Sequence, residues 1–335
     1  MTAIAQSAPL SVQPLARRAP ALSGWRIWRG GLIAALLWIA AAAFGHSVPG
    51  ITALPRTGLL AAIELALGLF IAALALAPWR RPARLTHASR WLAALPIGLA
   101  IWQYATNKTG ILPLPFFPAP EQVLEVYTDD WAKLLDSVVG SLILLVPGYA
   151  IGAGLGFVLG VAIGWSRAVH YWAHPLLRFI GPLPATAWLP IAFFCFPTTR
   201  SASTFLIALA SGFPVAVLTS SGVAGVTRAY YDIARNLGAD PHFLVRKVAI
   251  PAALPSVFVG LFMGLGSSFA VLIVAEMMGV KAGLGFYLQW AQGWAAYANI
   301  YAALVVMAIL FSGLIGLLFA VRDRVLAWQK GIVRW

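Results

Sequence analysis

The chain has 335 residues, of which 61% are hydrophobic and only 10% charged, and its mean hydropathy is +0.85. This composition excludes an ordinary soluble domain and indicates a protein that crosses the membrane several times. The formal net charge of +13 raises the alternative of nucleic-acid binding, which the placement of the charges argues against. The single cysteine, Cys195, excludes an internal disulfide and a cysteine-based metal site.

The apolar runs predict an all-α polytopic membrane protein with about eight transmembrane helices. Residues 1–30, rich in Ala, Pro, Ser and Arg, are expected to form a disordered cytoplasmic tail. A bilayer-spanning helix needs roughly 20 apolar residues. Runs of about this length lie at 28–45, 58–77, 91–106, 137–164, 176–196, 202–221, 253–279 and 298–321.

The basic residues give the predicted orientation. Of the 23 Lys and Arg, 18 fall in segments that are inside if the N-terminus is cytoplasmic, which are the tail, 78–90, 165–178, 222–252 and 322–335. The other five are Arg56, Lys108, Lys133, Arg200 and Lys281. Both termini and 222–252 are therefore predicted to be cytoplasmic, and the basic charge needs no nucleic acid to explain it.

The long outside linker 107–135 has two parts. Prolines at 113, 115, 118 and 120 oppose helix formation, and the acidic stretch 121–130 then predicts a short amphipathic helix. In the span that follows, Gly152, Gly156, Gly160 and Gly164 recur every four residues and share one helix face. Such a face allows close helix packing. We favour a contact within one subunit over a dimer seam.

The span 176–196 contains Pro182, Pro184 and Pro190, each of which removes a backbone donor. Carbonyls freed at membrane depth are tolerated only against protein or a water-lined cavity. The span is therefore either a kinked packing helix or, as we favour, a broken helix that lines a pathway. Residues assigned to that pathway are Pro182, Pro184, Trp188, Pro190, Ser267, Ser268 and Glu276.

Two acidic residues, Glu64 and Glu276, lie within predicted spans, where such residues are candidates for function. Glu276 is interpreted either as an anchor for the turn after its span or as a gating residue. His170 and His174 are four residues apart but have no third ligand near in sequence, so no metal is expected. The phosphate-binding pattern G-x4-G-K-S/T is absent, so the chain is not expected to be an enzyme that hydrolyses ATP.

The stretch 232–255 is the longest charged interruption in the apolar second half. Residues 232–237 predict a short helix, and Gly238 is suited to end it in a left-handed conformation. Asp240 is placed to cap a second helix that has Pro241 at its first position. Pro251 and Pro255 are expected to mark a turn back into the membrane.

This stretch resembles the cytoplasmic coupling loop of bacterial ABC importer permeases, whose pattern is E-A-A, three residues, G, nine residues, I-x-L-P. Here the matching residues are Asp232, Ile233, Ala234, Gly238, Ala239, Val248, Ile250 and Pro251. The departures are Asp for Glu, Ile for Ala, Val for Ile and Ile for Leu. The resemblance implies that this loop docks on a separate ATPase subunit, which would bind ATP and Mg²⁺, and that the chain itself holds no cofactor.

Two further stretches resemble the nitrate/sulfonate/taurine branch of these permeases. They are the P-x-P-x3-W-x-P run that starts at Pro182, and A-E-M-x-G at 275–279 followed by G-L-G. The resemblance covers roughly 91–330. It implies a six-helix permease domain at 91–335 with coupling loop 222–252, preceded by two accessory helices at 31–90.

The implied function is that of an inner-membrane permease subunit that imports a small anionic solute delivered by a periplasmic binding protein. A second permease, in a homodimer, would complete the pathway within the lipid bilayer. The alternative is an ion- or proton-coupled secondary transporter that uses Glu64 or Glu276.

The predicted topology is testable with single cysteines in a Cys195→Ser background. An impermeant thiol reagent added to intact cells should label a cysteine at position 129, because 107–135 is predicted to be outside. It should not label one at position 240. Labelling at position 240 with none at position 129 would show that the topology is the opposite of the predicted one.

Overall fold

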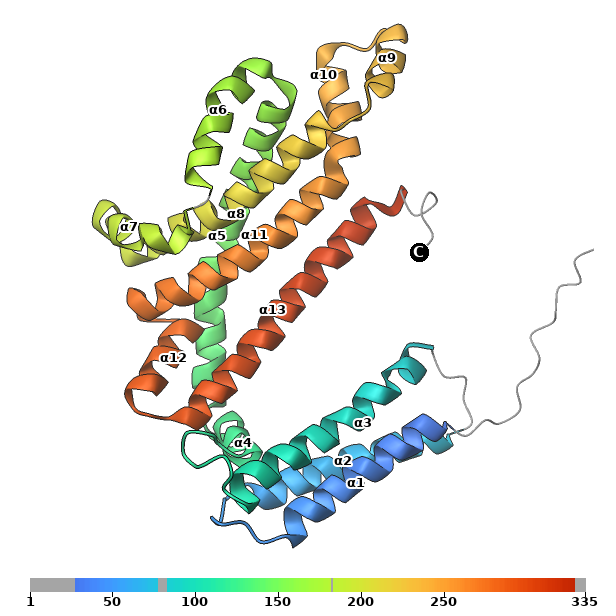
Figure 1. The fold of residues 1–335 in the computed structure, drawn as a ribbon, viewed down its shortest axis with the longest axis vertical. Helices are drawn as coiled ribbons and strands as arrows, with labels where there is room; N and C mark the ends of the chain where they lie inside the picture. Colours follow the sequence, from blue (N-terminus) through green and yellow to red (C-terminus); the bar gives the residue numbers. More distant parts are fainter. Residues whose placement is uncertain (1–27, 78–82, 182, 329–335) are drawn as a thin grey trace, which may run out of the picture. The chain divides into compact units, whose positions relative to one another are not determined.

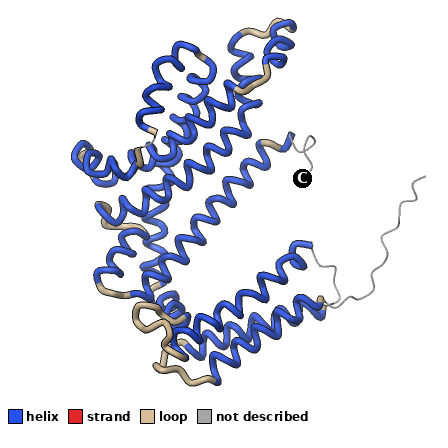
Figure 2. The backbone as a smooth tube through the Cα atoms, viewed as in Figure 1, coloured by secondary structure: helices blue, strands red, loops and turns tan. Residues whose placement is uncertain are grey.

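The structure, a computed structural model, describes residues 28–77, 83–181 and 183–328. The described residues form helices joined by loops, with no β-strand among them (Figures 1 and 2). They divide into two compact units. One holds the described residues up to Val48 together with Gly58–Ile101, and the other holds Pro49–Thr57 and the described residues from Trp102 onward.

The first unit consists of α1 (Arg29–Ser47), α2 (Thr57–Leu76) and most of α3 (Ala83–Gln103). The indole N–H of Trp38 in α1 donates to the Leu92 carbonyl in α3 at 3.0 Å. Ile71 of α2 is buried in the same apolar cluster, and Glu64 is 1% exposed. The packing thus groups most of α3 with the two N-terminal helices. The functional boundary at residue 91 stays a prediction.

The described residues of the second unit form ten α-helices. They are α4 (Pro120–Asp129), α5 (Trp131–Trp165), α6 (Arg167–Ile180), α7 (Leu189–Cys195), α8 (Thr199–Ala224), α9 (Arg228–Asn236), α10 (Pro241–Phe243), α11 (Ile250–Met278), α12 (Leu284–Gly293) and α13 (Tyr297–Val325). Within this unit, α9 and α10 lie at one end and α12 and α4 at the other (Figure 1). Two π-helical turns, Tyr104–Lys108 and Leu244–Ala249, and a 3₁₀ turn, Ala185–Trp188, complete it.

The predicted glycine face of α5 packs inside the subunit, against α8. A Cβ at Gly160 would lie 2.7 Å from the Ala216 carbonyl oxygen, and one at Gly156 would meet the Gly212 carbonyl. A Cβ at Gly152 or Gly164, or at Gly148 one turn earlier, would likewise meet a backbone carbonyl oxygen of α8. Because these neighbours are backbone atoms, α5 approaches α8 this closely only with glycine at these positions.

On its other side, α8 packs against α11. Ser268 of α11 is fully buried and donates a hydrogen bond to the Ile207 carbonyl of α8 at 3.2 Å. Gly264 lets the helices approach, since a Cβ there would lie 2.9 Å from the Ser211 carbonyl oxygen. The helices α5, α8 and α11 therefore form the packed centre of this unit, with α8 in the middle.

Six helical segments in the described ranges are long and apolar enough to cross a membrane. They are α1, α2, α5, α8, α13 and the continuous segment Pro241–Met278 that ends in α11. The pair α6 and α7, bent by 87°, would make a seventh. The prediction of an all-α polytopic membrane protein is confirmed. The expected span 91–106 falls mainly in α3, which is not among the six and which carries Arg90.

Three local expectations need correction. Residues 165–178 were expected to link two spans, but 167–180 form α6, whose residues are not buried. The stretch 284–293 forms α12, which the apolar pattern did not indicate. Neither Pro251 nor Pro255 marks a turn, because α11 runs through both. Pro251 is tolerated because it lies in the first turn of α11, directly after a π-helical turn that changes the hydrogen-bond register.

The contact between α5 and α8 predicts a difference between two neighbouring glycines. Gly156→Ala places a methyl group against backbone and should cost about 1–3 kcal/mol of stability. Gly154→Ala is the matched control, because a Cβ there meets no atom within 4 Å. In detergent, the thermal unfolding midpoint should fall for Gly156→Ala and stay near the parent value for Gly154→Ala. Equal midpoints would contradict this packing.

Candidate functional site

The loop between α8 and α11 has the backbone that the sequence predicted. The helix α9 begins at Arg228, four residues before the predicted stretch 232–237, and ends at Asn236, and Gly238 then has a φ of +83°. Asp240 caps the next helix by accepting a hydrogen bond from the Phe243 N–H at 2.7 Å, and Pro241 occupies its first turn. The chain therefore reverses sharply between α9 and α10.

The outer face of α9 is exposed, and its inner face is anchored. Leu237 is 83% exposed and Ile233 59%, and α9 has no buried residue. Tyr231 packs edge-on against Trp165 at the end of α5, with ring centroids 5.8 Å apart. Tyr231 also packs against the cluster of Val223, Ala249 and Ala253. This helix is thus held at the end of the α5–α8–α11 group while its apolar side faces outward.

The remaining residues of the predicted coupling motif divide between the loop and α11. Asp232 forms a long, exposed ion pair with Arg235 at 3.8 Å, and pairs of this kind contribute little to stability. Ala234 lies in α9, and Ala239 donates its N–H to the Ala234 carbonyl at 3.0 Å. Val248 lies in the π-helical turn, with Ile250 and Pro251 following at the start of α11.

Several predicted pathway residues meet in one cavity of about 320 Å³. Pro184, Trp188 and Ser267 all line it. Pro184 precedes the 3₁₀ turn between α6 and α7, so the break in this segment, which the prolines predicted, forms one wall of the cavity. Thr186, Phe213 and Pro214 also line it, and none of the described lining residues is acidic or basic.

The other predicted pathway residues lie elsewhere. Ser268 faces α8, as described above. Pro190 does not break a helix but starts α7, where its missing N–H costs no hydrogen bond. Pro182 lies outside the described residues. Phe213 was missed because a Phe within an apolar span looks the same in sequence whether it faces lipid, protein or a cavity.

Glu276 holds the turn between α11 and α12. Its Oε2 accepts hydrogen bonds from the Gly285 N–H at 2.7 Å and from the Ser141 hydroxyl at 3.0 Å, and the carboxylate is fully buried. The Leu284 N–H donates to the same hydroxyl at 2.9 Å. This geometry is that of the anchor, one of the two roles considered for Glu276. Glycine is needed at Gly283, which has a φ of +100° and lies against the carboxylate.

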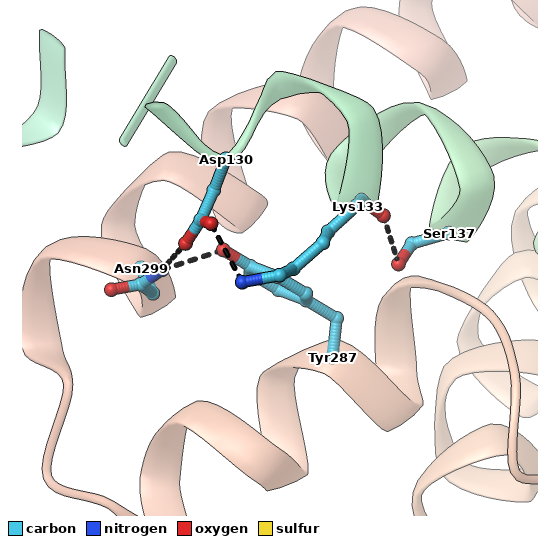
Figure 3. A network of polar contacts seen from close by, with 5 residues as sticks. All are labelled: Asp130, Lys133, Ser137, Tyr287 and Asn299. Carbon is cyan, nitrogen blue, oxygen red and sulfur yellow. Dashed lines mark hydrogen bonds and ion pairs between the residues drawn. The ribbon is translucent and has the colours of Figure 1, made fainter. Parts of the chain in front are cut away.

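A polar network joins the start of α5 to α12 and α13 at this end of the unit (Figure 3). Asp130 pairs with Lys133 at 2.8 Å and accepts a hydrogen bond from the Asn299 amide, which also donates to the Tyr287 hydroxyl at 2.6 Å. A pocket of about 450 Å³ beside it is lined by Lys133 and Lys281, with Asp136 as counter-charge. This end is therefore polar and charged.

At the same end, Asp129 joins α4 to the segment 49–57. Its carboxylate pairs with Arg56 at 2.7 Å. A hydrogen bond from the Thr128 hydroxyl, and then the one from Arg56, hold the pKa of Asp129 below its usual value. Both partners are exposed, so this contact positions the segment more than it stabilises the fold.

No three His, Cys, Asp or Glu side chains among the described residues gather as metal ligands. The stacked pair His170 and His174, with ring centroids 4.7 Å apart, has no third ligand there.

Comparison with known proteins gives a consistent picture. A probable ABC transporter permease of Brucella abortus is 32% identical over 250 residues, covering 74% of this chain and 98% of the relative. A bicarbonate transport system permease of Synechococcus elongatus is 33% identical over 198 residues, 58% of this chain and 68% of the relative. A nitrate import permease of Synechocystis is 27% identical over 251 residues, 72% of this chain and 87% of the relative.

The family model described as binding-protein-dependent transport system inner membrane component matches residues 152–328, which is more than half of the chain. The matched region runs from the glycine face of α5 through the proline break, the α9 loop and the Glu276 turn to the end of α13. The chain thus belongs to the family of binding-protein-dependent transport system inner membrane components and is a multi-pass permease of an ABC importer.

Proposed function

We propose that this permease carries a small oxyanion, such as nitrate, bicarbonate or a sulfonate including taurine, through a pathway formed between two copies of the chain. The relatives named for nitrate and bicarbonate import support this substrate class. Its energy would come from a separate ATPase subunit that binds ATP and Mg²⁺. We also propose a bacterial inner-membrane location, on the basis of the permease family, and cytoplasmic termini, on the basis of the distribution of Lys and Arg.

The observation that carries the proposal is the exposed α9. Ile233 and Leu237 present apolar side chains at the end of the packed helices, and nothing among the described residues covers them. The sharp reversal at Gly238 makes α9 a protruding, pre-formed element. Such a surface is suited to a groove on a partner protein. We assign α9 as the docking helix for the ATPase.

The helix α11 connects the docking helix to the cavity and can carry a displacement between them. It continues from α10 at the loop, contributes Ser267 to the cavity and carries Glu276 near its end, where this residue holds the turn to α12. A displacement of α9 would therefore reach the cavity wall and the opposite end through one continuous helix. We propose that ATP-driven movement of the ATPases opens the pathway alternately to the two sides in this way.

The opposite end would receive the solute from a periplasmic binding protein. It carries the polar network of Figure 3 and the pocket with Lys133 and Lys281. The helices of 31–90 fall before the family match and are proposed to be accessory to transport. The comparisons give no support to an ion-coupled transporter working through Glu64 and Glu276, and the turn between α11 and α12 uses the Glu276 carboxylate.

The first test separates the backbone of the loop from its side chains. Gly238→Val should abolish most stimulated ATP hydrolysis and uptake, because a β-branched residue at φ +83° is strongly disfavoured. The cost, about 1–2 kcal/mol or more, is comparable with typical coupling free energies of about 1–3 kcal/mol between sites. The measurement is ATPase activity of the purified complex with and without loaded binding protein, alongside uptake.

Gly238→Asn is the matched control, since asparagine adopts the left-handed conformation more readily. A Cβ at this position meets no atom within 4 Å, so the two variants differ mainly in backbone preference. Asn should keep most of the coupling that Val loses. If Gly238→Val retains both stimulated hydrolysis and uptake, the loop is a connector and the ATPase assignment fails.

A second test uses two adjacent serines. In a Cys195→Ser background, Ser267→Cys should react with a small water-soluble thiol reagent in at least one transport state, because Ser267 lines the cavity. Ser268→Cys should react at least tenfold more slowly, because Ser268 is buried against α8. The rates are measured in the complex with and without ATP. Equal reaction rates at the two positions would show that the cavity is not part of the pathway.

A further inference from the structure

A second, larger cavity of about 730 Å³ lies between the end of α5, the helix α6 and the second half of α8. It is at the α9 end of the unit, since Trp165 lines it and also packs against Tyr231. Its charged and polar lining residues are Ser166, Arg167, His170, His174, Arg178, Ser220 and Ser221. The motif comparison assigned none of these residues to a site.

The cationic side of this cavity comes from one face of α6. Arg167, His170, His174 and Arg178 are spaced by three and four residues, so they follow one another along the same face. All four line the cavity. The opposite face is apolar and exposed, with Trp172 at 75% exposed. The four basic side chains therefore face the cavity and remain open to water, while the aromatic side of the helix faces away from it.

Among the residues that the structure describes, no carboxylate lines this cavity. Within the described part of the chain, Arg167 and Arg178 are in none of the ion pairs. The facing wall adds the hydroxyl of Ser221 from α8, whereas the Ser220 hydroxyl already donates to the Val217 carbonyl at 2.8 Å. Guanidinium groups with hydroxyl donors and without a competing carboxylate are the chemistry that recognises an oxyanion.

The cationic cavity adjoins the neutral pathway cavity. Phe213 of α8 lines both, and its ring packs on the backbone of Gly181, directly after α6. A solute that leaves the hydroxyls and amides around Ser267 therefore meets the arginine-lined space on the other side of Phe213. The described residues around the neutral cavity carry no charge that would attract an anion, whereas the second cavity has the positive charges of Arg167 and Arg178.

We propose that the cavity lined by Arg167 and Arg178 is an oxyanion-binding subsite at the inner end of the pathway, occupied by the transported anion before its release. This inference rests on the proposed function for the nature of the solute. The open, water-accessible arginines make the binding weak, which suits a site from which the anion must leave.

The test measures the electrostatic potential in the cavity from labelling rates and does not depend on transport activity. The full chain with Cys195→Ser and Ser221→Cys is placed in nanodiscs of zwitterionic lipid without ATPase. Labelling rates are compared for an anionic and a cationic methanethiosulfonate of similar size. The anionic reagent should react faster, and Arg167→Gln with Arg178→Gln should lower the rate ratio by about three- to tenfold. Arg167→Lys with Arg178→Lys should restore it.

Lys247→Gln is the control, because Lys247 is an exposed cation near the α9 loop that does not line the cavity. It should leave the ratio close to the parent value. Sodium nitrate or sodium bicarbonate, at ionic strength matched with sodium chloride, should slow labelling saturably in the parent and not in the double glutamine variant. No difference between the parent and that variant would overturn the proposal.

Other occupants give different outcomes. If anionic lipid in the nanodisc protects Ser221→Cys while nitrate and bicarbonate do not, the oxyanion is a lipid phosphate and the transport subsite is wrong. If only added ATPase protects it, the cavity receives an acidic protein segment and the proposal is equally wrong. If the parent complex shows no ATP-driven uptake of nitrate or bicarbonate while these anions still protect Ser221→Cys from labelling, the proposed function alone is refuted. If the complex takes up these anions but they do not protect Ser221→Cys, the subsite alone is refuted.

Discussion

The close contact of α8 with α5 on one side and α11 on the other is the constraint on which the rest of the second unit depends. Glycines from Gly148 to Gly164 bring α5 against the backbone of α8, and Gly264 does the same for α11. In a bilayer the apolar side chains gain little by leaving lipid, so close backbone packing and interhelical hydrogen bonds must hold helices together. The bond from Ser268 to the Ile207 carbonyl is one of these. The packed group is thus a rigid frame for both cavities.

Around this frame, the proline-rich segment and α6 supply the irregular parts. The chain cannot continue α6 through Pro184, so it turns by 87° and leaves a neutral cavity beside Trp188. Before this turn, α6 lies across a second cavity from the end of α8, and Arg167 and Arg178 line that cavity. A broken helix is tolerated here because α8 and α11 cover the freed backbone.

The helix α11 connects the loop that carries α9 to the turn that Glu276 holds. At one end, the π-helical turn and Pro251 join α11 to the loop that displays α9. At the other end, Glu276 ties α11 to α12 and, through Ser141, to α5. The loop end is held by apolar packing of Tyr231 against Val223, Ala249 and Ala253, whereas the other end is held by the polar contacts of Glu276. Between them, α11 packs against α8, so one continuous helix joins the loop to the turn.

Much of this organisation is encoded locally, and the sequence alone determined it. Composition and apolar run lengths indicated the membrane-spanning helices, and the four-residue spacing of Gly152 to Gly164 indicated a packing face. Gly238 and Asp240 determined the loop backbone, because a left-handed residue and a helix cap act within a few residues. The short apolar-to-polar patterns of α6 and α12 did not reveal these helices, since neither is long enough to span a bilayer. The separation of Ser267 from Ser268, the meeting of Glu276 with Ser141, and the gathering of Arg167, Arg178 and Ser221 around one cavity were decided only by the tertiary structure. The physical reason is that these contacts join residues tens to more than a hundred positions apart, or depend on which side of a helix faces α8.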